Sequence, residues 1–201
     1  LNMTDVARLI PLLDADAHKI AVAGGLLLFV VFGIKAAMLP VGFWLPKTYA
    51  VATTPVAALF TIMTKVGVYA ILRVNGTVFD DALSHKILQD CLLTIGLISS
   101  LYGVIGAIGA ERLRRFVGFM MLSSIGTILI AISMLNTQVW SAALYYLVHS
   151  TLIAAAFYLL CGWITSQRGA FKDHFNIAPQ MKQHKILAIT YFMIALMMAG
   201  L

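Results

Sequence analysis

Long apolar runs separated by short connectors set the strongest limit on how this chain of 201 residues folds. About 20 consecutive apolar residues are enough for a helix to cross the hydrocarbon core of a bilayer, where only helices and closed barrels satisfy the backbone. The expected spans are residues 20–45, 55–72, 87–110, 116–135, 140–165 and a shorter run at 186–201. The sequence therefore predicts an all-α bundle of about six transmembrane helices.

The whole chain, residues 1–201, is expected to form a single membrane domain. It begins with Leu1 and stops inside a run that is short for a membrane span, so we expect an internal piece of a longer protein, cut at both ends. Residues 4–13 are expected to form at most a short interfacial segment, because Pro11 interrupts them.

Composition excludes several classes of function. With 61% hydrophobic and 11% charged residues, the chain lies outside the usage of soluble domains. The formal net charge of +6 does not indicate a nucleic-acid partner, because the basic residues lie mostly in short connectors. Cys91 and Cys161 each stand alone in an apolar run and are expected to be packed thiols. No soluble-enzyme motif, metal spacing or redox-centre pattern is present, so we expect neither enzyme activity nor a cofactor.

Basic residues are distributed unequally between the two sides of the expected bundle. One side carries Arg8, Lys19, Arg73 and Lys86, and the other carries Lys47, Arg112, Arg114, Arg115, Arg168, Lys172, Lys182 and Lys185. Loops rich in lysine and arginine usually stay in the cytoplasm. The connectors at 111–115 (ERLRR) and 166–184 are therefore expected to be cytoplasmic, and the connector at 74–85 to lie outside.

Two lysines lie deep inside the apolar runs. Lys35 lies within residues 23–46, and Lys65 is the eleventh of 18 residues in the run 55–72. A charge near the centre of a membrane helix costs roughly 2.5–3.5 kcal/mol on insertion scales, and such residues usually face a polar cavity or a partner. Neutralising a lysine at pH 7 costs a comparable amount, about 4–5 kcal/mol. A neighbouring charge can then decide between the two forms, so the lysines predict a path that moves charge.

The first span is expected to break beside Lys35. Pro40 lies inside the span and cannot donate to the carbonyl of Ala36, and Pro46 is expected to close the span. Within a bilayer, a freed carbonyl persists only where protein or water satisfies it. A broken helix next to a buried charge is typical of transporters.

Lys65 shares a helix face with Thr61 and Tyr69, four residues away on either side. This spacing predicts a hydrated stripe in which Lys65 exchanges protons. The alternative, a lysine that snorkels to the interface, fits the central position poorly. For Lys35, the alternative is a structural pair with an acidic residue outside this chain, and such a pair is itself compatible with proton transfer.

His149 lies one turn after Tyr145 and Tyr146 in a later apolar run. Imidazole accepts and donates protons at physiological pH, which suits a relay, although a hydrogen-bonded core histidine is the alternative. Hydroxyl groups on the neighbouring spans either line a water path or form packing hydrogen bonds. They belong to Ser99, Ser100, Tyr102, Ser123, Ser124 and Thr127.

Residues 33–74, GIKAAMLPVGFWLPKTYAVATTPVAALFTIMTKVGVYAILRV, resemble the signature of the proton-translocating antiporter-like subunits. That family comprises the A-type and D-type subunits of Mrp-type multisubunit cation/proton antiporters and the membrane pump subunits of respiratory complex I. The shared pattern is Lys35, Pro40, the WLP of Trp44 to Pro46, a PVAA connector, and Lys65 on the next helix. The segments ERLRRFVGFMMLSSIGT and ALYYLVHSTLIAAAFYLL fit the same family, and most closely the D-type subunit of the K⁺/H⁺ (Pha-type) group.

The resemblance implies a fold of inverted five-helix repeats and a proton relay through Lys35, Lys65 and His149, with Pro40, Trp44, Pro46, Thr61 and Tyr69 in support. It also implies a secondary transporter subunit in a bacterial inner membrane, with other antiporter subunits, protons, Na⁺ or K⁺ and lipid as partners. Two departures stand out. Many members carry a lysine about one turn after the histidine, where this chain has Leu152, Ile153 and Ala154, and the ERLRR segment departs from the usual DLKRLxAYSS pattern.

Our hypothesis is thus a piece of a D-type subunit of a multisubunit monovalent cation/proton antiporter. One alternative is a proton-pumping membrane subunit of complex I (NADH-quinone oxidoreductase) or of a related membrane hydrogenase. The other is a purely structural membrane subunit whose lysines are inert.

Overall fold

The computed structural model describes residues 2–78, 82–134, 136–169, 173–176 and 181–199. Its helices are α1 (Met3–Leu9), α2 (Ala15–Lys35), α3 (Trp44–Val51), α4 (Thr54–Val78), α5 (Ala82–Ile108), α6 (Leu113–Ser133), α7 (Thr137–Arg168) and α8 (His184–Ala199), with short 3₁₀ turns at Ile10–Leu12 and Val41–Phe43. No strand occurs in these ranges, which confirms the all-α prediction.

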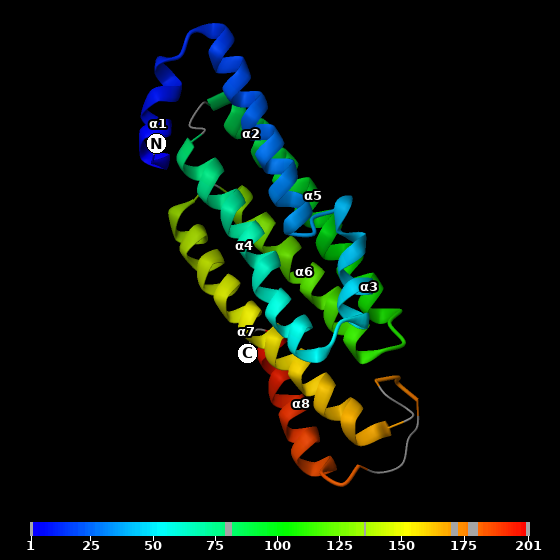
Figure 1. Cartoon of the computed structure of the whole chain (residues 1–201). Helices are drawn as coiled ribbons and strands as arrows, with labels where there is room; N and C mark the ends of the chain where they lie inside the picture. The colour runs from blue at the N-terminus through cyan, green and yellow to red at the C-terminus, as the bar shows by residue number, and fades with distance from the viewer. Residues whose placement is uncertain (1, 79–81, 135, 170–172, 177–180, 200–201) are drawn as a thin grey trace.

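The long helices run up and down along one axis and form an elongated bundle (Figure 1). Five of them, α2 and α4 to α7, are long and apolar enough to cross a membrane, and α8 is a shorter apolar helix. α6 lies at the centre, in contact with α3, α5 and α7. In its most apolar stretch 67% of the residues are buried, against 11% for α2, which lies at the edge of the described bundle.

The N-termini of α4 and α7 begin at residues that commonly start helices. Asn136 caps α7, because its side-chain oxygen accepts a hydrogen bond from the N–H of Gln138 at 2.9 Å. Pro55 lies in the first turn of α4, where its missing N–H costs nothing. The connector expected at 74–85 is shorter than predicted, because α4 continues to Val78 and α5 begins at Ala82. Residues 75–77 therefore belong to α4 and not to the connector.

The first span is broken, as predicted, but the break is wider than one proline. α2 ends at Lys35, five residues before Pro40. Ala37 has a φ of 56°, and the N–H groups of Ala37 and Met38 donate to the carbonyls of Ile34 (3.1 Å) and Gly33 (2.9 Å). This pair of bonds is a Schellman motif, which satisfies carbonyls that the end of a helix leaves free. The N–H of Leu39 then donates to the buried hydroxyl of Ser99 on α5 at 3.2 Å.

Pro46 does not close the span, contrary to our prediction. It lies in the first turn of α3, where proline is tolerated, and it is buried against α6. Gly118 of α6 permits this contact, because a Cβ at that position would lie 2.9 Å from the Cα of Pro46. The Tyr49 hydroxyl, later in α3, donates to the carbonyl of Phe60 on α4 at 2.7 Å. The short helix is thereby held between α4 and α6.

The connectors at 111–115 and 166–184 meet at one end of the bundle. Arg112 pairs with His174 in an isolated antiparallel bridge, the N–H of Leu113 donates to the carbonyl of Asp173 at 2.8 Å, and the N–H of Phe175 donates to Glu111 at 3.1 Å. The two segments therefore lie on the same side of the bundle. Lys172, one of the basic residues counted on this side, lies outside the described residues.

The two cysteines differ in exposure. Cys161 on α7 is buried, as predicted for a packed thiol, whereas Cys91 on α5 is exposed. The prediction for Cys91 is wrong because it lies on a face of α5 that no described helix covers.

Candidate functional site

Lys65 is the most deeply placed charged side chain of the described residues. It lies on α4 with 1% of its surface exposed. Its Nζ donates a hydrogen bond to the Oγ of Ser124 on α6, at 2.7 Å. Among the described residues no carboxylate lies within ion-pair distance of Lys65. A lysine in this position contacts a neutral hydroxyl in place of a counter-ion.

Ser124 has a second hydrogen bond that fixes its orientation. Its hydroxyl donates to the carbonyl of Met121, one turn earlier in α6, at 2.8 Å. A serine hydroxyl has one proton to donate and two lone pairs that accept. With the proton directed at Met121 and one lone pair occupied by Lys65, one lone pair remains for a further donor.

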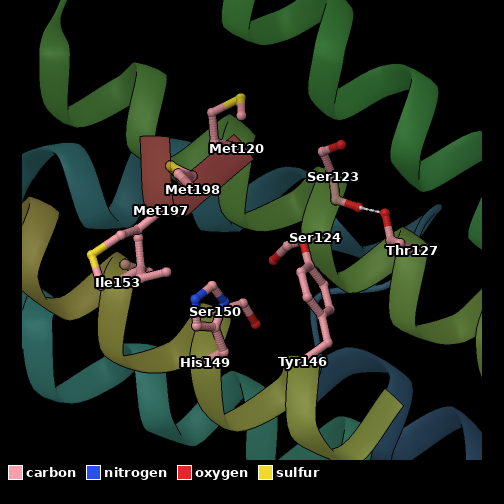
Figure 2. Close-up of a pocket in the computed structure, with 11 residues that line it drawn as sticks. Met120, Ser123, Ser124, Thr127, Tyr146, His149, Ser150, Ile153, Met197 and Met198 are labelled. Carbon is pink, nitrogen blue, oxygen red and sulfur yellow. Dashed lines mark hydrogen bonds between the residues drawn. The ribbon is translucent and has the colours of Figure 1, made fainter. Parts of the chain in front are cut away.

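Ser124 also lines a cavity of about 160 Å³ between α6, α7 and α8, called the polar cavity below (Figure 2). Its polar lining consists of Ser123, Ser124, Thr127, Tyr146, His149 and Ser150. Figure 2 shows these side chains gathered from α6 and α7, with Met197 and Met198 contributed by α8. A polar cavity of this size has room for more than one water molecule.

His149 lines the polar cavity from α7 and is half-buried. Its ring stacks on that of Tyr145, with the centroids 6.1 Å apart and the planes 13° from parallel. Ser124 is therefore linked to both predicted residues: it accepts a hydrogen bond from Lys65, and it lines the same cavity as His149.

Lys35 is placed differently. It is the last residue of α2, and the described helices leave its side chain exposed and without a hydrogen bond to any described residue. Its backbone, in contrast, packs against α4: a Cβ at Gly67 would lie 3.1 Å from the Lys35 carbonyl carbon and 2.8 Å from the nitrogen of Ala36. Gly67 is two residues from Lys65, so the break in α2 lies against the part of α4 that carries Lys65.

Thr61 and Tyr69 do not continue the contact between Lys65 and Ser124. Thr61 is buried and donates to the carbonyl of Ala58 within its own helix, at 2.7 Å. Tyr69 is 45% exposed. Together with Lys65, it lines a groove of about 240 Å³ between α4 and α7 whose other side chains are mostly apolar, among them Leu147 and Leu152.

The remaining predicted residues belong to the break. Pro40 is exposed in the turn before the second 3₁₀ segment, and Trp44 begins α3 with its ring 6.2 Å from that of Tyr49. Many family members are expected to carry a lysine about one turn after His149. Two of the residues at that place in this chain, Ile153 and Ala154, line the polar cavity. The cavity therefore contains His149 without such a lysine.

Sequence reasoning did not predict the hydrogen bond between Ser124 and Lys65. The sequence placed it among six hydroxyl-bearing candidates, but no periodicity pairs position 65 with position 124. A serine on the buried face of the central helix was the one available signal.

A family model described as the transmembrane part of NADH:quinone oxidoreductase/Mrp antiporter proteins matches residues 2–201. The chain belongs to this family, and it is a multi-pass membrane protein. One relative is the D-type subunit of a probable K⁺/H⁺ antiporter of Rhizobium meliloti (strain 1021), 38% identical over 175 residues, which are 86% of this chain and 32% of the relative. Another is the D-type subunit of a Na⁺/H⁺ antiporter of Bacillus subtilis (strain 168), 29% identical over 204 residues, which cover 100% of this chain and 40% of the relative.

A solved structure, that of the Mrp complex from Dietzia sp. DQ12-45-1b, matches the whole chain with a TM-score of 0.80 and 27% sequence identity. The match covers 36% of the corresponding chain of that complex. The present chain thus spans about a third to two fifths of the length of the proteins it resembles. The similarity confirms the antiporter-like fold expected from residues 33–74.

Proposed function

We propose that this chain is the proton-translocating part of a D-type subunit of a multisubunit monovalent cation/proton antiporter. Lys65 exchanges protons with His149 by way of the polar cavity that His149 lines, and Lys35 supplies a further site at the break in α2. The observation that supports this most strongly is the burial of Lys65 against the neutral hydroxyl of Ser124.

The charge of Lys65 is not fixed by a carboxylate of the described residues. A structural lysine inside a bundle is normally held by a carboxylate, which keeps it permanently charged. Lys65 has no such partner among the described residues. The cost of burying the charged form is therefore balanced only by the cost of removing the proton to give the neutral form. A charge arriving nearby then shifts the balance, which is what a proton relay requires.

Lys35 is included in the proposed relay because of its position at the break in α2. It ends α2, where the partial negative charge of the helix C-terminus stabilises a cation. Its side chain is exposed in the described bundle, and we propose that it meets an acidic group in another part of the subunit or of the complex. A proton on Lys35 would alter the field at Lys65, because the α2 break packs on α4 at Gly67.

The names of the relatives support the membrane, the partner subunits and the ions that we propose, and the basic residues support the orientation. Relatives from Rhizobium meliloti and Bacillus subtilis are named as D-type antiporter subunits, which supports a bacterial cell membrane, other antiporter subunits as partners, and H⁺ with Na⁺ or K⁺ as the ions moved. The excess of arginine and lysine at 111–115 and 166–184 supports a cytoplasmic position for that end. The described contacts between the two segments agree with a shared side.

The family description also includes NADH:quinone oxidoreductase, so a redox-driven pump subunit is the second candidate. The two are distinguished by an assay of the complete complex, purified through the full-length subunit and reconstituted in vesicles. The proposal expects a K⁺ or Na⁺ gradient alone to move protons. Proton movement that requires NADH and quinone, together with co-purified iron–sulfur subunits, would establish the second candidate instead.

A further inference from the structure

Lys65 and His149 belong to different spaces in the bundle. Lys65 lines the mostly apolar groove between α4 and α7, and His149 lines the polar cavity between α6, α7 and α8. Ser124 lines the polar cavity and is also the hydrogen-bond partner of Lys65. Within the described part of the chain, the route of polar contacts from the lysine to the cavity therefore passes through one hydroxyl.

A buried serine in this helix can satisfy its hydroxyl by donating to a backbone carbonyl, without a contact to a lysine. Ser133, also on α6 and 2% exposed, satisfies its hydroxyl by donating to the carbonyl of Ile130 at 2.7 Å. Ser124 has the equivalent bond to Met121 at 2.8 Å and accepts from Lys65 as well. The two serines thus share helix, burial and backbone bond, and differ in the lysine.

We propose that Ser124 is a proton-carrying residue between Lys65 and water held in the polar cavity. The inference rests on the proposed function. When Lys65 is charged, its Nζ passes a proton to the Oγ of Ser124, while the hydroxyl's own proton leaves to a cavity water and onward to a ring nitrogen of His149. Lys65 becomes neutral, His149 becomes charged, and Ser124 returns to its starting state with one proton.

The geometry meets the requirements of this step. The distance of 2.7 Å between Lys65 Nζ and Ser124 Oγ is that of a short hydrogen bond, so the proton has little distance to cross. Rotation about the Cβ–Oγ bond redirects the Ser124 proton from the Met121 carbonyl toward the cavity without moving the backbone. The cavity of about 160 Å³ and its hydroxyl lining suit water molecules that each need two to four polar partners.

The test compares Ser124→Ala with Ser133→Ala in the full-length subunit of the assembled complex. We expect Ser124→Ala to slow cation-driven proton exchange by about 10²-fold, the order that one positioned proton-transfer group contributes. Ser133→Ala should retain the wild-type rate, and Ser124→Thr, which keeps the hydroxyl, should retain most of it. The cation concentration at half-maximal rate should not change in any of the three.

A solvent-isotope measurement separates proton transfer from a structural role. If Ser124 carries the proton, its removal makes that transfer limiting, and the ratio of rates in H₂O and D₂O rises in Ser124→Ala. A slower rate with an unchanged isotope ratio would overturn the proposal, as would a wild-type rate in Ser124→Ala. If Ser124→Ala fails to assemble, Ser124→Val replaces it, because valine has the shape of the threonine in Ser124→Thr but lacks the hydroxyl, and we expect the same slowing and the same rise in isotope ratio.

Lys65→Ala is measured beside these variants, so that the two proposals fail separately. If Lys65→Ala exchanges normally, the proposed function of Lys65 is wrong. If Lys65→Ala is inactive and Ser124→Ala is normal, the relay stands and the role of Ser124 is overturned.

Discussion

The guanidinium of Arg114 at the start of α6 donates to the hydroxyl of Thr54 at 2.9 Å and to the carbonyl of Ala52 at 3.1 Å. One side chain thereby joins the first turn of α6 to the segment that leads from α3 into α4. The N–H of Arg114 lies 3.4 Å from the carboxylate of Asp173, which is buried. This end of the bundle is fixed by a planar cation that makes two directed contacts.

Arg114→Lys should therefore destabilise the protein although it keeps the charge. An ammonium group does not reproduce the two-armed geometry of a guanidinium, and loss of a charge-assisted bond of this kind costs about 1.5–3 kcal/mol. We expect a lower unfolding temperature of the detergent-solubilised complex. Arg112→Lys is the control, because Arg112 is exposed and joins His174 through its backbone. Equal stability of the two variants would contradict the assignment.

Gly67→Ala should disturb the packing of the break on α4. A Cβ at Gly67 would lie 2.8 Å from the nitrogen of Ala36, and this neighbour is backbone that cannot turn aside. Overpacking of this kind costs typically about 1–3 kcal/mol, so both unfolding temperature and exchange rate should fall. Gly24→Ala on α2 is the matched control, because a Cβ there meets nothing within 4 Å. A Gly67→Ala protein as stable as Gly24→Ala would show that the two segments do not touch.

Lys35→Ala is expected to stop cation-driven proton exchange without lowering stability. Its side chain makes no hydrogen bond to a described residue, so its removal leaves no described partner unsatisfied. The measurement is exchange in everted vesicles, paired with the amount of assembled complex. Lys47→Ala, an exposed lysine beyond the break, should exchange normally. Wild-type exchange in Lys35→Ala would remove Lys35 from the relay.

Single cysteines at the two ends of α6 test the proposed orientation. Glu111 and Gln138 are both exposed, the first just before α6 and the second just after it, in the first turn of α7. The background must lack Cys91, which is exposed, as well as Cys161. An impermeant thiol reagent added to whole cells should label Gln138→Cys and spare Glu111→Cys. The opposite pattern would invert the proposed topology.

The sequence was most informative where the membrane leaves few options. A span needs about 20 apolar residues and an internally satisfied backbone, so the positions and order of the long helices followed from the apolar runs, although the first run divides into α2 and α3. The boundaries of the break did not. α2 ends at Lys35 through Ala37 in a left-handed conformation that glycine usually adopts, and no sequence rule marks an alanine for that role.

The sequence predicted which ionisable residues belong to the candidate site, but it did not predict the contacts between helices that link them. Lys65 and His149 are conspicuous because ionisable groups in apolar runs are expensive. The bond from Lys65 to Ser124 joins residues 59 positions apart, and it depends on how α4 and α6 pack. Thr61 and Tyr69 show the converse. They share a face with Lys65 by spacing, yet Thr61 is buried with its hydroxyl donated to a carbonyl of its own helix, and Tyr69 is 45% exposed.

The proposed relay requires Lys65 to release and regain its proton during transport. Lys65→Arg tests this most directly, because arginine keeps the positive charge but does not deprotonate in proteins. Cation-driven proton exchange is measured for Lys65→Arg and Lys65→Ala in vesicles that contain equal amounts of assembled complex. We predict that the two variants are impaired to nearly the same extent. Normal exchange in Lys65→Arg would contradict it, because a fixed charge would then be all that position 65 supplies.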